Sequence, residues 1–316
     1  MKRKSKYFLK INELLTFLNL KDSADYDQNP DYPMQVPVSY ALKMEKGNPL
    51  DPLFLQVVPR LQERKNKKGY SEDPVGDKDS TCLDGILQKY KGRILLICGN
   101  ACSVKCRFCF RRNEKCLTTP NLEKNLVSFF KEKRNVEEII FSGGDPFLYP
   151  LEKLDTILKI LGPIAEVQTI RFHSRVPVTE PERAKDLLPL IEKYKSRFRF
   201  VLVIHANHAN ELRGKTPEIL KEFLNEEVLL LNQSTLLKGI NDNSKTLKEL
   251  SLALFKSHVL PYYLHVLDHA KGTSHFEISD KKAIQIHNEL KAMLPGYLVP
   301  KLVREIPKEK SKTAVY

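Results

Sequence analysis

Three cysteines on one short segment are the residues whose types and spacing most directly indicate chemistry. Cys102, Cys106 and Cys109 are separated by three and then by two residues, so a single loop can turn all three sulfurs inward. This spacing suits a metal ion or an iron–sulfur cluster better than a disulfide. Basic neighbours favour the thiolate form that a metal requires, and the segment carries Lys105, Arg107, Arg111 and Arg112.

The cysteine segment is one ligand short of a closed site, since zinc and cluster sites normally take four ligands. Either a more distant residue such as Cys98 or Cys116 completes the set, or a substrate or cofactor fills the open position. Buried cysteines without any ligand are the competing interpretation, and the close spacing of three of them disfavours it. On balance, Cys82, Cys98 and Cys116 are expected to be ordinary thiols.

The composition is that of an ordinary globular protein. The 316 residues include 41% hydrophobic and 29% charged side chains, with a formal net charge of +13 and a pI near 9.3. The charge permits an anionic ligand, but no repeat of basic and aromatic residues indicates nucleic acid binding. No apolar run reaches the ~18 residues of a membrane span, and Lys10, Asn12 and Glu13 interrupt any signal sequence. Six cysteines, half of them clustered, indicate a reducing compartment, and we predict a cytoplasmic enzyme.

From Leu83 onward, runs rich in β-forming residues alternate with amphipathic segments of helical length. This alternation predicts an α/β fold with a parallel sheet and right-handed crossovers. The expected strands are 93–98, 137–141, 167–172, 198–204, 228–231 and 259–266. The expected helices between them are 122–133, 151–161, 182–195, 217–225 and 244–256. Residues 1–76 are predicted to form an accessory region, with a helix at 12–21, a short helix near 39–46, and prolines that forbid long helices elsewhere.

Each expected strand is followed by an unusual polar segment. In parallel α/β barrels the loops after the strands converge, so these segments should meet at one site. Turn formation alone would explain the glycine, asparagine, aspartate and serine in them, but not the histidines and arginines. His205, His208, His265, His269 and His275 stay undecided between ligand contact and structural hydrogen bonding. The segments are Gly99-Asn100, Ser142 to Asp145, His173 to Arg175, His205 to His208, Asn232 to Ser234, and Asp268-His269.

With Phe108 before the third cysteine, the segment resembles the signature Cys-x-x-x-Cys-x-aromatic-Cys of the radical S-adenosylmethionine enzymes. The resemblance implies a partial TIM barrel, a (β/α)6-like parallel barrel preceded by the accessory region. It implies that Cys102, Cys106 and Cys109 hold a [4Fe–4S] cluster whose fourth iron binds S-adenosylmethionine. It also implies that the cofactor contacts Phe108, Ser142, Gly143, Gly144, Asp145, Ser174 and Arg175.

Further motifs narrow this resemblance to the lysine 2,3-aminomutases over residues 86–312. In order they are Cys-Arg-x-Cys-x-Arg-Arg, Ser-Gly-Gly-Asp, Ser-Arg-x-Pro-Val, His-x-Asn-His, Asn-Gln-Ser-x-Leu-Leu-Lys-Gly, Pro-Tyr-Tyr and Gly-Tyr-x-Val-Pro. The chain is most similar to the branch that supplies (R)-β-lysine for elongation factor P. The resemblance thus implies an isomerase acting on L-lysine, with pyridoxal phosphate as a third cofactor. A ligase and elongation factor P would follow, flavodoxin or ferredoxin would supply electrons, and a homo-oligomer is allowed.

The same resemblance assigns the remaining site residues. Lys312, in the C-terminal segment 301–316 that follows the barrel at 77–300, would carry pyridoxal phosphate. Arg111 would pair with the substrate carboxylate, and Asp268 and Glu305 with its ε-ammonium group. Cations and donors near the phosphate would be Lys89, Arg93, Asn232, Gln233 and Ser234.

Two departures from the catabolic aminomutases and two other interpretations accompany these assignments. Glu305 replaces an aspartate, and Lys308-Glu309-Lys310-Ser311 stands where a glycine run precedes the lysine.

Acids at the far end of the substrate favour a dibasic amino acid over glutamate. The alternatives are a radical aminomutase for another amino acid, or a zinc-loop protein that binds RNA or a ribosomal partner.

Overall fold

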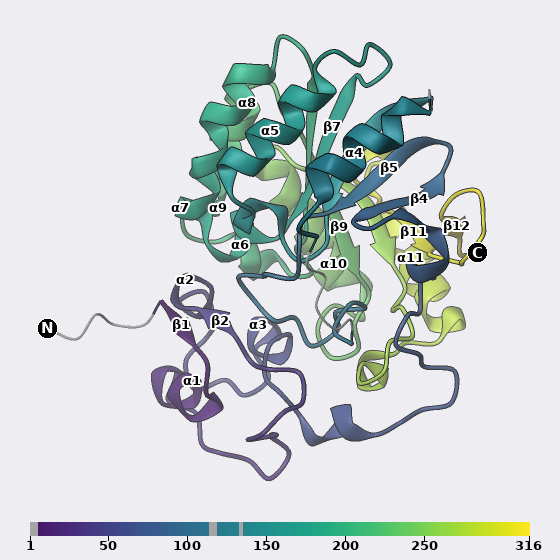
Figure 1. Ribbon diagram of the computed structural model, residues 1–316. Helices are drawn as coiled ribbons and strands as arrows, with labels where there is room; N and C mark the ends of the chain where they lie inside the picture. The colour runs from purple at the N-terminus through teal and green to yellow at the C-terminus, as the bar shows by residue number, and fades with distance from the viewer. Residues whose placement is uncertain (1–5, 114–118, 133–134) are drawn as a thin grey trace, which may run out of the picture.

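A curved sheet of ten strands organises the computed structural model, which describes residues 6–113, 119–132 and 135–316 (Figure 1). The strands lie side by side in chain order, from β3 at one edge to β12 at the other. Neighbours from β5 to β11 pair in parallel, whereas β3, β4 and β12 pair antiparallel at the two edges. The bounds are β3 Thr81–Leu83, β4 Ile86–Tyr90, β5 Gly92–Ile97, β6 Val136–Ser142, β7 Thr169–Ser174, β8 Arg199–Ile204, β9 Leu229–Thr235, β10 Leu260–His265, β11 Lys301–Arg304 and β12 Thr313–Ala314.

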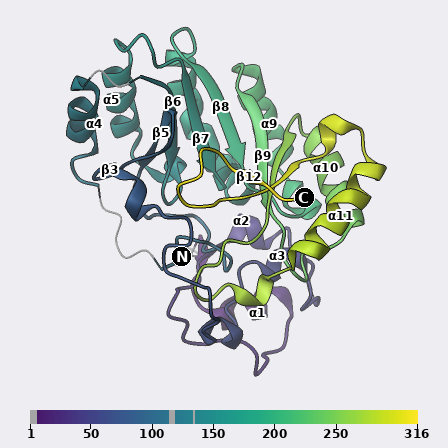
Figure 2. The ribbon, with the colours of Figure 1, turned by 90° about the vertical axis from the view of Figure 1, so that its right-hand side faces the viewer.

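Helices join the successive parallel strands and lie on the outer side of the sheet (Figures 1 and 2). In α10 the buried side chains Leu247, Leu250 and Leu254 recur at helical spacing, so one face packs inward. Asn243 begins this helix by accepting a hydrogen bond from the Thr246 amide at 2.9 Å. The bounds are α4 Leu122–Lys131, α5 Leu151–Leu161, α6 Val176–Thr179, α7 Pro181–Ala184, α8 Leu188–Tyr194, α9 Thr216–Asn225, α10 Ser244–Lys256 and α11 Asp280–Met293.

The accessory region packs against one end of the barrel, shown in purple in Figure 1. Its short elements are separated by prolines, as expected from the sequence. Buried Tyr40 and Phe54 belong to the same hydrophobic cluster as Phe108, Val176 and Val178 of the barrel. The two parts therefore share one core. The bounds are β1 Tyr7–Phe8, α1 Ile11–Leu18, β2 Val36–Pro37, α2 Val38–Ala41, α3 Pro52–Leu55 and the 3-10 turn η1 Leu61–Arg64; a second 3-10 turn, η2 Lys78–Ser80, follows at the start of the barrel.

The α/β partial barrel predicted from the sequence is confirmed. All six expected strands are present as β5 to β10, and β11 adds a seventh parallel strand. The expected helix at 182–195 is divided, because Pro189 lacks an amide hydrogen and stands in the first turn of a new helix, α8. Among the described residues, no helix is both long and apolar enough to cross a membrane.

Candidate active site

A cavity of about 1060 Å³ opens at the carboxyl ends of the parallel strands. The last residue of each strand from β6 to β10 lines it, namely Ser142, Ser174, Ile204, Thr235 and His265. Five of the six polar segments expected to converge contribute at least one residue to it, whereas Gly99-Asn100 does not line it. Apart from Asn232 and Ser234, every residue assigned to the site from the sequence borders this cavity.

The cysteine loop follows β5 and forms one wall of the cavity, to which Cys102, Cys106 and Cys109 all contribute. A buried arginine at the end of β7 approaches it, and Arg175 Nη1 donates to Cys106 Sγ at 2.7 Å. Phe108 is buried, with its ring 5.4 Å from that of His205 and 5.6 Å from the Arg175 guanidinium. The aromatic position of the motif thus packs the loop against residues that follow β7 and β8.

The Ser-Gly-Gly-Asp segment after β6 docks against the cysteine loop. Gly143 has a φ of 112°, and a Cβ atom on Gly144 would lie 2.3 Å from the Ala101 carbonyl oxygen. The Gly144 amide donates to the Gly99 carbonyl at 2.6 Å, and the Asp145 amide donates to that of Ala101 at 2.7 Å. Two glycines are needed because a side chain would separate these backbones.

Asp145 joins the tips of β6 and β7. Its buried carboxylate accepts hydrogen bonds from Ser174 Oγ and from the Arg175 amide, both at 2.7 Å, and from the amides of Phe147 and Val176. Burial raises the pKa of this carboxyl, although these donors oppose the shift. The geometry therefore gives Asp145 a role in holding two strand tips together, which the sequence did not reveal.

A row of alternating charges runs along another wall of the cavity. Arg111 donates from Nε and Nη2 to Asp77 Oδ2 at 2.9 and 2.8 Å, and Lys89 Nζ lies 2.7 Å from Asp77 Oδ1. Lys89 Nζ is also 3.8 Å from Glu305 Oε1, and Lys312 Nζ donates to Glu305 Oε2 at 2.8 Å. Five charges thus form one network, which places Arg111, Lys89 and Lys312 beside Asp77 and beside Glu305, one of the two acids assigned to the substrate ammonium.

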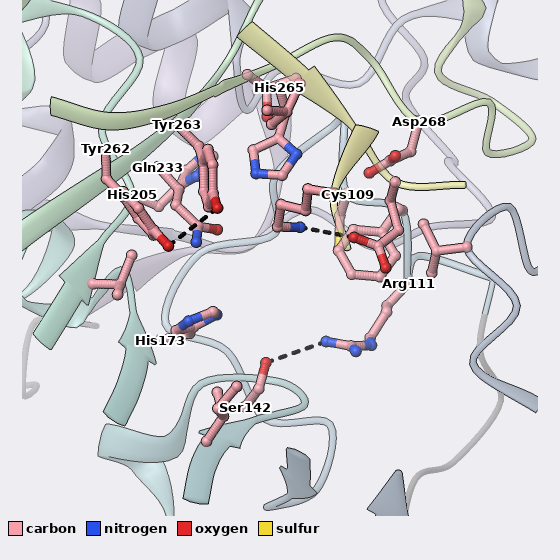
Figure 3. Close-up of a pocket in the computed structure, with 18 of the residues that line it drawn as sticks. Cys109, Arg111, Ser142, His173, His205, Gln233, Tyr262, Tyr263, His265 and Asp268 are labelled. Carbon is pink, nitrogen blue, oxygen red and sulfur yellow. Dashed lines mark hydrogen bonds and ion pairs between the residues drawn. The ribbon is translucent and has the colours of Figure 1, made fainter. Parts of the chain in front are cut away.

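Asp77 is the member of this row that the sequence did not single out. It lies just before η2 and reaches the cavity beside Arg111. Burial would raise its pKa, but the charges of Arg111 and Lys89 outweigh burial and lower it. No motif marks this residue, so only the folded chain reveals it. Arg111 also reaches Ser142 Oγ at 3.3 Å (Figure 3).

Lys312 reaches the cavity because the chain turns back after β11. Strand β12 pairs antiparallel with β11, with Thr313 opposite Arg304, so Lys312 comes beside Glu305. Lys308, in the turn between them, has a φ of 70°, a left-handed conformation that glycine adopts at lower cost. The turn therefore forms without the glycine run of the catabolic enzymes.

Asp268 follows β10 and lies on the same side of the cavity as Arg111 (Figure 3). Burial raises its pKa to about 6, while the charge of Lys312 lowers it and that of Glu305 raises it. Glu305 behaves oppositely: burial raises its pKa, but Lys312 and a hydrogen bond from Tyr90 at 2.7 Å outweigh burial and lower it. The two acids therefore differ in how readily they ionise.

The phosphate contacts expected from β9 are partly corrected. Gln233 lines the cavity, whereas Asn232 and Ser234 face the other side of the sheet and bind the Ala206 carbonyl at 3.1 and 2.9 Å. Alternate residues of a strand point to opposite faces, so the three side chains cannot all reach one ligand. Arg93 does line the cavity and stacks over the Tyr90 ring at 4.6 Å.

Five nitrogen atoms of residues that line the cavity lack hydrogen-bond partners among the described residues. They are Arg171 Nε, His173 Nε2, Arg175 Nε, Gln233 Nε2 and His265 Nε2. Burial lowers the pKa of both imidazoles, so both are neutral at pH 7. Figure 3 shows Gln233 and His265 beside Tyr262 and Tyr263, whose hydroxyl groups lie 3.1 Å apart. Buried polar atoms normally have partners, so these are positions where a ligand would bind.

Comparison with known proteins agrees with this geometry. The family model described as Radical SAM superfamily matches residues 96–244. The L-lysine 2,3-aminomutases of Haemophilus influenzae and Escherichia coli are each 40% identical to the chain, covering 95% and 96% of it and 90% of each relative. That of Buchnera aphidicola is 38% identical, over 95% of the chain and 90% of the relative. The chain belongs to the lysine 2,3-aminomutase family. This aminomutase is therefore an isomerase of the radical S-adenosylmethionine superfamily, which uses a [4Fe–4S] cluster and S-adenosylmethionine.

The cysteine loop of the aminomutase fits such a cluster. Among the described residues, no three Cys, His, Asp or Glu side chains gather around a single ion, but each thiolate of a [4Fe–4S] cluster binds a separate iron atom. Burial raises the pKa of Cys109 to about 11 and raises that of Cys102 further, so cluster assembly would displace protons from both. Cys98 is buried behind the loop with its Sγ 3.9 Å from the Leu96 carbonyl, and Cys116 lies outside the described residues.

Proposed function

We propose that this aminomutase moves the α-amino group of L-lysine to C3 and forms (R)-β-lysine in the cytoplasm. The observation that carries the proposal is the set of residues that line the cavity described above. Three cysteines stand on one wall, and a lysine with two partly buried carboxylates, Asp268 and Glu305, stands on another part of it. A basic amino acid is the substrate that two such acids would select.

Pyridoxal phosphate fits the residues around Lys312. The lysine amine reaches the cavity, and Lys89 and Arg93 supply cations for a phosphate. Tyr263 lies beneath the amine, with Lys312 Nζ 5.8 Å from its ring. Bound pyridoxal phosphate would let the substrate nitrogen migrate between neighbouring carbons, while the cluster and S-adenosylmethionine would supply the radical that starts the reaction.

The side chains of the chain itself would bind and orient the substrate. Arg111 would bind the lysine carboxylate, for which a planar guanidinium is suited. Asp268 and Glu305 would bind the ε-ammonium group and set its distance from the cofactors. The phenyl ring of Phe108, the partly buried histidines and the tyrosines line the cavity, which would help to exclude water from a reactive intermediate.

An anaerobic assay tests the activity directly. The reconstituted protein would be incubated with pyridoxal phosphate, S-adenosylmethionine, dithionite and L-lysine, followed by chiral mass spectrometry. We expect (R)-β-lysine, and no product when S-adenosylmethionine is omitted. Cleavage of S-adenosylmethionine without β-lysine would show that the substrate is another amino acid. Failure of both reactions in protein with an intact cluster would contradict the aminomutase activity.

The pKa of Asp268 predicts how lysine use depends on pH. A carboxyl whose pKa is raised to about 6 becomes neutral as the pH falls below that value, and it then no longer attracts the ε-ammonium group. We expect kcat/KM for lysine to fall as the pH drops through this range. D268N should lack this acidic limb and lose ~2–5 kcal/mol of transition-state stabilisation at neutral pH, as when one partner of a buried charge pair is removed.

Asp280 provides the control for this pH profile. It pairs with Arg304 at 2.6 Å on the surface, away from the cavity, so D280N should keep both the activity and the acidic limb. An acidic limb that persists unchanged in D268N would show that another group titrates.

We also propose that the β-lysine passes to a ligase that attaches it to elongation factor P, with flavodoxin or ferredoxin as electron donor. The sequence resemblance described above supports this part of the proposal. Purified elongation factor P, incubated with the ligase and the reaction product, should gain the mass of one β-lysyl group. If the ligase uses α-lysine equally well, the proposed destination of the product is wrong.

A further inference from the structure

The accessory region contacts the backbone of the cysteine loop directly. The Lys105 amide donates to the Gln35 carbonyl at 3.0 Å. In return, Gln35 Nε2 donates to the carbonyls of Cys102 and Ser103 at 2.7 and 3.2 Å. One residue of the accessory region therefore binds three backbone groups between the first and second cysteines.

Glu63 of the accessory region holds the two arginines that flank the third cysteine. Arg107 Nε donates to Glu63 Oε1 at 2.9 Å, and Arg107 Nη2 and Arg112 Nη2 both bind Glu63 Oε2. The Arg107 side chain is fully buried, and its Nη1 donates to the Tyr32 carbonyl at 2.9 Å. Both guanidinium groups also stack on Tyr32, at 4.9 and 4.8 Å from its ring.

These contacts correct the expectation that Arg107 and Arg112 serve the thiolates. Their guanidinium groups are bound to the accessory region instead, and the Arg107 amide donates to the Gln56 carbonyl at 2.9 Å. Residues 98–113 contain neither a helix nor a strand, so no regular pattern of backbone hydrogen bonds holds this loop in place. Its conformation depends on contacts from outside.

We infer that Gln35 and Glu63 are positioning residues that hold the cysteine loop in the conformation that receives the cluster. The inference rests on the proposed assignment of the cluster to Cys102, Cys106 and Cys109. Gln35 fixes the backbone between the first two cysteines, and Glu63 fixes both sides of the third through the two arginines. The accessory region is on this view part of the cluster site.

The test compares Q35A and E63Q with a matched control, R64Q. Arg64 neighbours Glu63 in η1, but its ion pair, 2.6 Å to Asp27, stays within the accessory region. Three quantities would be measured on the reconstituted protein: the rate of iron release to a chelator, the electron paramagnetic resonance spectrum of the reduced cluster with and without S-adenosylmethionine, and the visible absorbance of bound pyridoxal phosphate.

We expect Q35A and E63Q to release iron at least ~10-fold faster than the wild type, because removing one partner from a buried polar network is strongly destabilising. Their spectra should broaden and respond less to S-adenosylmethionine, whereas the pyridoxal absorbance should stay. R64Q should match the wild type in all three. Wild-type iron release from both Q35A and E63Q would overturn the inference, as would equal loss of iron in R64Q. Iron retained by C106A would instead show that the cluster assignment itself is wrong.

Discussion

C106A is expected to lose the cluster and the cleavage of S-adenosylmethionine together. A [4Fe–4S] cluster with three protein ligands has no spare thiolate, and Cys106 is the middle one of the three. Its sulfur also receives the Arg175 hydrogen bond at 2.7 Å, so alanine leaves a buried guanidinium nitrogen without that partner. Iron and acid-labile sulfide would be quantified in the anaerobic protein, and methionine and 5′-deoxyadenosine would be measured after reduction.

C98A is the matched control. Cys98 is buried and lies only four residues before the first cysteine of the loop, but its sulfur contacts the Leu96 carbonyl on β5. We expect this variant to keep its iron, its sulfide and its cleavage activity. A cluster retained by C106A, or lost from C98A, would show that the ligand set differs from Cys102, Cys106 and Cys109.

K312A is expected to bind no pyridoxal phosphate covalently and to form no measurable β-lysine, while its cluster remains. The Lys312 amine is the one that the turn between β11 and β12 brings to Glu305, and alanine has no group that could replace it. The visible absorbance of the cofactor would be recorded after removal of free pyridoxal phosphate, and mass spectrometry after borohydride treatment would locate the modified peptide.

K310A tests whether another lysine of the same segment could serve. Lys310 is exposed on the turn and does not line the cavity, so K310A should bind the cofactor as the wild type does. Cofactor absorbance that survives in K312A and disappears in K310A would move the attachment site.

The strands could be predicted because their apolar runs are continuous, as buried parallel strands require. Several elements were not predicted, and two of them show a physical reason. Strand β11 has only four residues and carries a charge at each end, and helix α11 buries only Ala283, Ile286 and Leu290 in fourteen residues. Neither has a hydrophobic pattern strong enough to distinguish it from a surface segment.

The parts of the candidate site that lie in continuous sequence motifs could be predicted. Side chains that reach the site only when the chain folds could not. The cysteine loop and the Ser-Gly-Gly-Asp segment are continuous in sequence, so their spacing indicates them directly. Asp77 has no motif and meets Arg111 and Lys89 only in the folded chain. Asn232 and Ser234 share a motif with Gln233, but a motif does not tell which face of the strand each residue occupies.

The ion pair between Lys312 and Glu305 couples the two roles proposed for these residues. Lys312 Nζ lies 2.8 Å from Glu305, so the amine proposed to carry pyridoxal phosphate contacts the acid proposed to bind the ε-ammonium group of the substrate. A cofactor attached to Lys312 would engage that nitrogen, and Glu305 would keep Tyr90 and Lys89 as neighbours. On these assignments, cofactor attachment would make the acid available to the free amino acid.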